Sequence, residues 1–226
     1  MKRIAILAVV AVTTFGIACN SDKRTSTADA PAVGTSGRNA TDVSRGDRDF
    51  VNDLTIANMA EIELGRMAAE KATNAEVKRF GQMMADDHTA AGNKLKPIAT
   101  QHSIPMPTEL DDTHRELRDK LAKLSGAEFD REYMKAMVDG HEDAADKLES
   151  RIDKKRLAEY KAQYADGTTG RKEKEEIKVD AVLPEQSDDR VTMSVNQWAA
   201  ETYPAVWAHL QKAKALNETV SKSATN

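Results

Sequence analysis

Apolar residues recur every three or four positions in several long stretches of this chain, which is the periodicity of an amphipathic helix. The first stretch runs from about Asp47 to Lys71. The second opens at Thr73-Asn74-Ala75-Glu76, which has the spacing of a capping box, and Pro97 either kinks it late or brings its end forward. Alternating apolar and polar positions, which are typical of strands, are almost absent. The pattern therefore predicts an all-α domain.

Two more helices are expected after an extended connection. A short one covers about residues 111–124, and a second capping-box pattern, Ser125 with Glu128, opens a long helix. The apolar face of the long helix continues to about Ile152. The helix can extend to about Tyr164, where its charges indicate an end that projects into water.

The last helix is expected from about Met193 to Asn217, and Pro204 inside it implies either a kink or an earlier helical start. Four long helices, a short extra helix and no internal repeat are typical of a four-helix bundle. We place the bundle domain at residues 47–217 and expect an exposed, charged insertion at residues 165–190. Residues 218–226 should form a frayed tail.

The start of the chain is typical of a bacterial export signal, with Lys2-Arg3 followed by an apolar run from Ile4 to Val12. This run is too short to span a membrane as a mature helix. Gly16-Ile17-Ala18-Cys19 resembles the lipobox of bacterial lipoproteins, in which the cysteine becomes the lipidated first residue. We expect a signal peptide at residues 1–18; the alternative is an ordinary secretory signal with an incidental cysteine.

Residues 19–46 are rich in small and polar side chains and are expected to form a disordered tether behind the lipid on Cys19. Asn20 is not the aspartate associated with retention at the inner membrane. The expected location is therefore the periplasmic side of the cell envelope, with a lipid anchor in the outer membrane. The membrane is then a partner of this protein through its anchor.

The composition and motifs of the chain exclude or disfavour several kinds of site and ligand. Cys19 is the only cysteine, which excludes an intrachain disulfide and a zinc site built on thiolates. The formal charge is −4, and loss of Lys2 and Arg3 with the signal takes it to −6, which disfavours nucleic-acid binding. No glycine-rich phosphate loop or Ser-His-Asp arrangement stands out, so no catalytic residue is proposed.

Three histidines fall on the apolar faces of three different expected helices: His88, His141 and His209. Imidazole is the commonest metal-ligating side chain, and bundles build metal sites from inward-facing side chains. His102 and His114 lie at a helix end and on the short helix, and we interpret them as ordinary surface or packing residues. The alternative for the inward three is that each packs in the core with a hydrogen-bond partner.

Four separate motifs resemble the domain-of-unknown-function family 4142. They are Met59-Ala60-Glu61-Ile62-Glu63-Leu64-Gly65, Phe80-Gly81-Gln82-Met83-Met84-Ala85-Asp86-Asp87-His88-Thr89, Phe129-Asp130-Arg131-Glu132-Tyr133-Met134 with Met137-Val138-Asp139-Gly140-His141, and Tyr203-Pro204-Ala205-Val206-Trp207-Ala208-His209-Leu210. The resemblance covers about residues 50–152 and 198–216, whereas residues 153–195 look longer than the family pattern. It implies an exported bacterial protein with a ferritin-like helical fold, and it implies no activity.

Di-iron ferritin-like sites require bridging carboxylates, including a glutamate three residues before each ligand histidine of two helices. Here Ala85, Val138 and Val206 stand three residues before the inward histidines, which argues against a di-iron centre. Three imidazoles with one carboxylate suit a single divalent cation such as zinc, copper or iron(II).

Glu63 on the first helix is the first candidate for the carboxylate ligand, with Glu61 as the alternative, because the two flank the apolar stripe of that helix on opposite sides. Asp87 and Asp139, each beside an inward histidine, are candidate outer hydrogen-bond acceptors.

Three classes of function remain open. The first is a binding or envelope-stress protein that holds a metal, an envelope partner or another copy of itself. The second is a metal-dependent redox enzyme on the same fold, which we favour less than binding without turnover. The third is a structural envelope protein with no ligand. A shared metal requires ring nitrogens within roughly 3 to 5 Å of one another.

Overall fold

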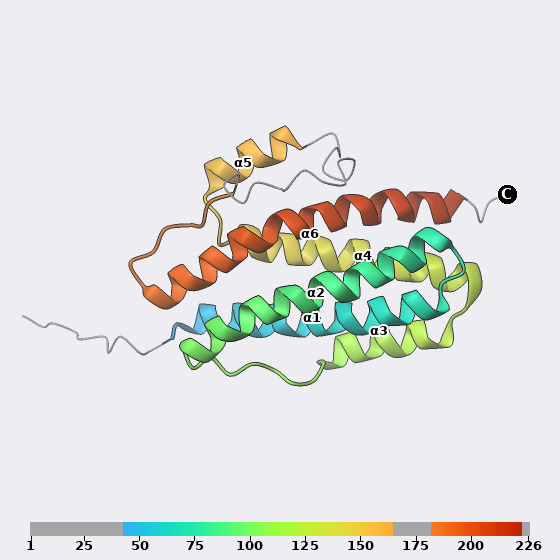
Figure 1. Ribbon diagram of the computed structural model, residues 1–226, viewed down its shortest axis with the longest axis horizontal. Helices are drawn as coiled ribbons and strands as arrows, with labels where there is room; N and C mark the ends of the chain where they lie inside the picture. Colours follow the sequence, from blue (N-terminus) through green and yellow to red (C-terminus); the bar gives the residue numbers. More distant parts are fainter. Residues whose placement is uncertain (1–42, 165–181, 223–226) are drawn as a thin grey trace, which may run out of the picture. The chain divides into compact units, whose positions relative to one another are not determined.

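The computed structural model describes residues 43–164 and 182–222, and this part of the chain is helical (Figure 1). The helices are α1 (Arg45–Lys71), α2 (Ala75–Gln101), α3 (Asp112–Lys123), α4 (Gly126–Glu149), α5 (Lys154–Gln163) and α6 (Arg190–Lys222). The all-α prediction is confirmed. The signal peptide, Cys19, the tether up to residue 42, residues 165–181 of the insertion and residues 223–226 lie outside the described residues.

Four long helices, α1, α2, α4 and α6, form a bundle, in which α1 packs mainly on α2 and α4 on α6. The starts of α1 and α6 share one apolar cluster with the ends of α2 and α4, so α1 and α6 run opposite to α2 and α4. Because α2 and α4 are parallel, the chain crosses the length of the bundle between them, and α3 lies in this crossover (Figure 1). One long crossover is a connectivity that ferritin-like folds use. The ferritin-like assignment itself stays a prediction.

The core consists of two apolar clusters separated along the bundle. One gathers residues such as Phe50, Leu95, Leu148 and Val195, and the other gathers residues such as Leu64, Phe80, Met137 and Ala213. Along each long helix, the gap between its two sets of apolar residues holds polar side chains: Asn58 and Glu61 on α1, His88 on α2, His141 on α4 and His209 on α6. A polar layer therefore crosses the middle of the bundle.

The caps differ from the two predicted capping boxes. Asn74, not Thr73, caps α2, since its side chain accepts hydrogen bonds from the N–H groups of Glu76 and Val77. Thr73 instead donates its hydroxyl to the buried carboxylate of Asp130 on α4. Ser125 precedes α4 but makes no side-chain capping bond. A tertiary contact thus overrides the local pattern at Thr73.

The helix expected to run to Tyr164 ends at Glu149, and α5 is a separate helix. Asp153 caps α5 by accepting a hydrogen bond from the Arg156 N–H. Tyr160 of α5 is 1% exposed, so this segment packs on the bundle instead of projecting into water. The break lets Ile152 form an isolated bridge with Pro184.

The last helix begins at Arg190 and continues to Lys222, which is longer at both ends than expected. Val220 near its end is buried and holds the last turns against the bundle. Pro97 and Pro204 lie inside α2 and α6, respectively, and end neither helix. Within the described ranges, no helix is long and apolar enough to cross a bilayer.

Candidate metal centre

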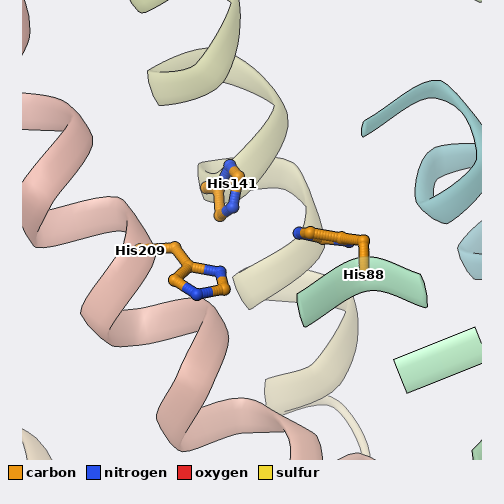
Figure 2. A group of neighbouring side chains, drawn as sticks. All are labelled: His88, His141 and His209. Atoms are coloured by element: carbon orange, nitrogen blue, oxygen red, sulfur yellow. The ribbon is translucent and has the colours of Figure 1, made fainter. Parts of the chain in front are cut away.

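The three inward histidines meet in the polar layer, although they come from α2, α4 and α6. One ring nitrogen of each lies within 4.8 Å of the chosen nitrogens of the other two. The ring centroids are 5.6 Å apart for His88 and His141, 5.8 Å for His88 and His209, and 5.6 Å for His141 and His209. Figure 2 shows the rings converging on one spot from three helices. The ring nitrogens are therefore as close to one another as binding of a shared cation requires.

Hydrogen bonds at the far side of two rings define which nitrogen carries the proton. The Nδ1 of His141 lies 2.8 Å from the carbonyl oxygen of Met137, one turn earlier in α4. The Nδ1 of His88 lies 3.2 Å from the amide oxygen of Asn58 on α1. Both oxygens are acceptors, so each Nδ1 donates an N–H and the proton of each neutral ring sits there.

In His209 the nitrogen with an acceptor is Nε2 and not Nδ1. Its Nε2 lies 3.0 Å from a carboxylate oxygen of Asp87 on α2, so Nε2–H is the donor. The remaining nitrogens are Nε2 of His88, Nε2 of His141 and Nδ1 of His209. All three are buried, and none has a hydrogen-bond partner. The cluster therefore gathers three unprotonated nitrogens from rings whose other nitrogens are each fixed by an acceptor.

Burial keeps two of these rings neutral. Removal from water lowers the pKa of His141 to about 3, and nearby His209 adds to this effect, while the hydrogen bond to Met137 opposes it. Burial, followed by the proximity of His141 and His209, lowers the pKa of His88 well below its ordinary value. Neutral imidazole is the form that binds a metal. The cluster thus presents ligating rings at neutral pH.

The structure brings Glu61, and not Glu63, to the histidines. Glu63 is half exposed and lies 3.6 Å from the guanidinium of Arg118, so the structure does not place this candidate ligand at the histidines. Glu61 is 8% exposed, and its Oε1 lies 3.5 Å from Nδ1 of His141. Burial raises the pKa of Glu61 to about 8. Because it adjoins the nitrogen that donates to Met137, Glu61 is placed as an outer partner of His141 and not as a direct ligand.

Two glycines make room for these outer partners. A Cβ atom at Gly92 would lie 2.8 Å from the Asn58 amide nitrogen, and one at Gly140 would lie 3.2 Å from the Glu61 Oε1. Any larger side chain at Gly92 would therefore displace the amide that holds His88. The layer depends on small residues as well as on polar ones.

A cavity of about 780 Å³ adjoins the cluster between α1, α3 and α4. Its wall includes Glu61, His88 and His141, together with apolar side chains from the three helices. A second cavity of about 60 Å³ adjoins His88 and His209. The histidine layer is thus flanked by open space and is not packed against protein atoms on every side.

The other candidate residues make contacts of their own. His102 contacts the hydroxyl of Ser194 at 3.1 Å, and His114 pairs with Asp111, consistent with ordinary packing roles. Asp139, expected as an outer acceptor, pairs with Lys135. Asp87 is an outer acceptor, but of His209 across the bundle and not of its neighbour His88.

Sequence reasoning missed Asn58, which lies on α1 beside the apolar stripe. An inward-facing amide at the same level as a histidine is the pattern that could have identified it. It also missed Gly92 and Gly140, whose part in the layer follows only from interhelical distances.

Comparison with known families gives one match. The model of a family described as "Domain of unknown function (DUF4142)" matches residues 32–169. No curated protein and no solved structure matches the chain. The matched segment contains His88 and His141, whereas His209 on α6 lies beyond it.

Proposed function

Because the chain belongs to the DUF4142 family, whose description gives no activity, we propose its function from the site itself: the bundle binds one divalent metal ion through His88, His141 and His209. Binding, and not turnover, is the function that we assign. Zinc, copper and iron(II) are the ions that suit three imidazole ligands.

One observation carries this proposal. Each of the three rings that approach one another within 4.8 Å has one unprotonated nitrogen that is inaccessible to solvent and lacks any hydrogen-bond donor. Buried acceptors without a donor are costly, and three of them together repel one another. A cation at the centre satisfies all three at once. The opposite nitrogens bond to a carbonyl, an amide and a carboxylate, which is the outer arrangement that metal-ligating histidines use.

The spacing supports a mononuclear site that contracts slightly on binding. Ligand nitrogens of a tetrahedral zinc ion lie about 3.4 Å apart, given zinc–nitrogen distances of about 2.0 to 2.1 Å. The present upper limit of 4.8 Å requires small inward shifts of the rings. Among the described residues, no carboxylate belongs to this group of possible ligands. A di-iron motif has a glutamate three residues before a ligand histidine, and here those positions hold Ala85, Val138 and Val206.

The test is metal stoichiometry measured on matched variants. Metal-stripped bundle should bind one equivalent of Zn²⁺ in calorimetry, and chelator should lower the melting temperature of the loaded protein. His141→Leu should abolish binding while the bundle stays folded, because leucine is apolar and close to histidine in volume. His102→Leu is the control, since His102 lies outside the cluster, and it should bind one equivalent.

Absence of stoichiometric Zn²⁺, Cu²⁺ and Fe²⁺ binding, with no effect of chelator on melting, would overturn the proposal. A hydrogen-bonded water among the rings would then account for the cluster. In that case His141→Leu should change stability by roughly 1 to 3 kcal/mol and have no other effect.

We also propose that the bundle acts at the periplasmic side of the envelope, anchored through lipid on Cys19. The charged start, the apolar run and the lone cysteine after Gly16-Ile17-Ala18 support this location. Cys19→Ala should release the protein from the membrane fraction or leave the signal uncut. Mature protein that begins at another residue and carries no acyl mass would contradict the anchor.

A further inference from the structure

The cluster takes its three histidines from three of the four bundle helices, and the fourth helix, α1, contributes no imidazole. Ala57 and Ala60 of α1 line the larger cavity together with Glu61, His88 and His141. A tetrahedral ion with three protein ligands keeps one position for an external ligand. The open space beside the cluster therefore lies on the side of the helix that contributes no imidazole.

Part of the cavity wall is apolar. Leu54 and Leu64 of α1, Leu117 of α3 and Met137 of α4 all line it. Its volume of about 780 Å³ falls in the range of small-molecule sites, which is roughly 300 to 1,000 Å³. An apolar ligand body would be removed from water there.

The positive side chains in the lining are already paired. Lys120 contacts Glu132 at 2.5 Å, and Lys147 contacts Asp53 at 2.5 Å. Lys135 pairs with Asp139. A metal ion held by three neutral rings would keep its full positive charge beside the cavity, and an anionic oxygen ligand would be drawn to it.

We propose that this cavity binds a small carboxylate with an apolar body, whose head occupies the fourth position of the metal ion and whose body lies between α1, α3 and α4. The inference rests on the proposed metal site and extends it to a class of ligand. It assigns α3 the role of covering the ligand body, through Leu117, in addition to linking α2 to α4.

The experiment uses the Co²⁺-loaded protein, because the visible absorption of Co²⁺ reports on its ligands. Octanoate should change the absorption spectrum and bind at least tenfold more tightly than acetate, which has the head without the body. Octanol, which has the body without the carboxylate, should leave the spectrum unchanged. Ala136→Trp and Leu117→Trp each fill the cavity from a different helix, and both should weaken octanoate binding at least tenfold.

Ala215→Trp on the exposed face of α6 is the matched control and should bind octanoate as the unaltered protein does. If Co²⁺ gives no spectrum of a bound ion, the proposed metal function fails and this inference fails with it. If Co²⁺ binds but octanoate changes nothing, or binds no better than acetate, the ligand inference alone is overturned. Unchanged octanoate binding in folded, Co²⁺-loaded Ala136→Trp and Leu117→Trp would also overturn it.

Discussion

The carboxylate of Asp87 lies 3.0 Å from Nε2 of His209, so the residue directly before one histidine of the cluster holds another histidine on a different helix. Asp87 and His88 leave α2 in different directions, as neighbours on a helix must. One reaches across to α6, and the other points into the layer. This contact joins α2 and α6 at the level of the proposed metal.

Replacing Asp87 should weaken metal binding without unfolding the bundle. Asp87→Ala removes the acceptor that keeps the proton of His209 on Nε2 and its Nδ1 free, and losses of about 10- to 100-fold are typical for such outer partners. Asp86→Ala is the control, because Asp86 is exposed and bonds to Gln82. Calorimetric Zn²⁺ titration of both variants gives the measurement. Equal affinities would show that Asp87 does not orient the ring.

An alanine at Gly92 should disturb His88 through Asn58. Glycine-to-alanine changes inside helices usually stabilise by roughly 0.5 to 1 kcal/mol. At Gly92 the new Cβ would lie 2.8 Å from the Asn58 amide, so Zn²⁺ affinity should fall and the usual gain in stability should be absent. Gly46→Ala, whose Cβ meets nothing closer than 3.9 Å, should keep full affinity. Retained affinity in Gly92→Ala would mean that Asn58 is dispensable.

The stability of the metal-free bundle should depend on pH through His88, His141 and Glu61. The folded pKa of His141 is about 3 against an ordinary 6.5, and that of His88 is also lowered, so the unfolded chain binds more protons below pH 6.5. Their contribution to stability is present above pH 6.5 and is lost as pH falls. Glu61 keeps its proton up to about pH 8 when folded but releases it above about 4.5 when unfolded. Its contribution is lost as pH rises through that window.

Together these three groups place the stability maximum of the stripped protein near pH 6.5. Melting temperatures in chelator between about pH 4 and 9 measure the profile. Glu61→Gln should remove the decline between pH 6.5 and 8, because an amide has no proton to release, whereas Glu63→Gln on the surface should leave it. A decline that persists in Glu61→Gln would exclude Glu61 as its source.

The hydroxyl of Tyr133 is buried without a hydrogen-bond partner, next to the layer. Tyr133→Phe should therefore leave the free energy of unfolding unchanged or raise it, since removal of an unsatisfied polar group costs nothing. Tyr203→Phe is the comparison, because the Tyr203 hydroxyl donates to Glu149 at 2.9 Å, and its loss should cost about 1 kcal/mol or more. Urea unfolding of both variants tests this. A clear loss in Tyr133→Phe would contradict the prediction.

The helical periodicity predicted the four long helices and the inward direction of His88, His141 and His209, since the residues that define a face are local in sequence. It did not predict that α4 stops at Glu149, because that break is stabilised by distant groups. Arg151 after the break contacts Asp47 of α1 at 2.6 Å, and Ile152 bridges to Pro184. Contacts between distant parts of the chain cannot be recognised from the periodicity of apolar residues in the sequence.

The sequence likewise could not decide whether Glu61 or Glu63 lies beside the histidines. Both flank the apolar stripe of α1, and only the positions of the neighbouring helices decide which is buried. Gly140 on α4 provides the space that Glu61 fills, whereas Arg118 on α3 draws Glu63 toward the surface.

The polar layer between the two apolar clusters also sets the register of the bundle. Leucines, methionines and alanines tolerate a slide of one helical turn, about 5.4 Å, with modest repacking. The layer does not, because such a slide would separate Asp87 from His209 and Asn58 from His88, leaving buried polar groups without partners. The polar layer therefore fixes the axial position of each long helix relative to the others, which apolar packing alone would fix less strictly.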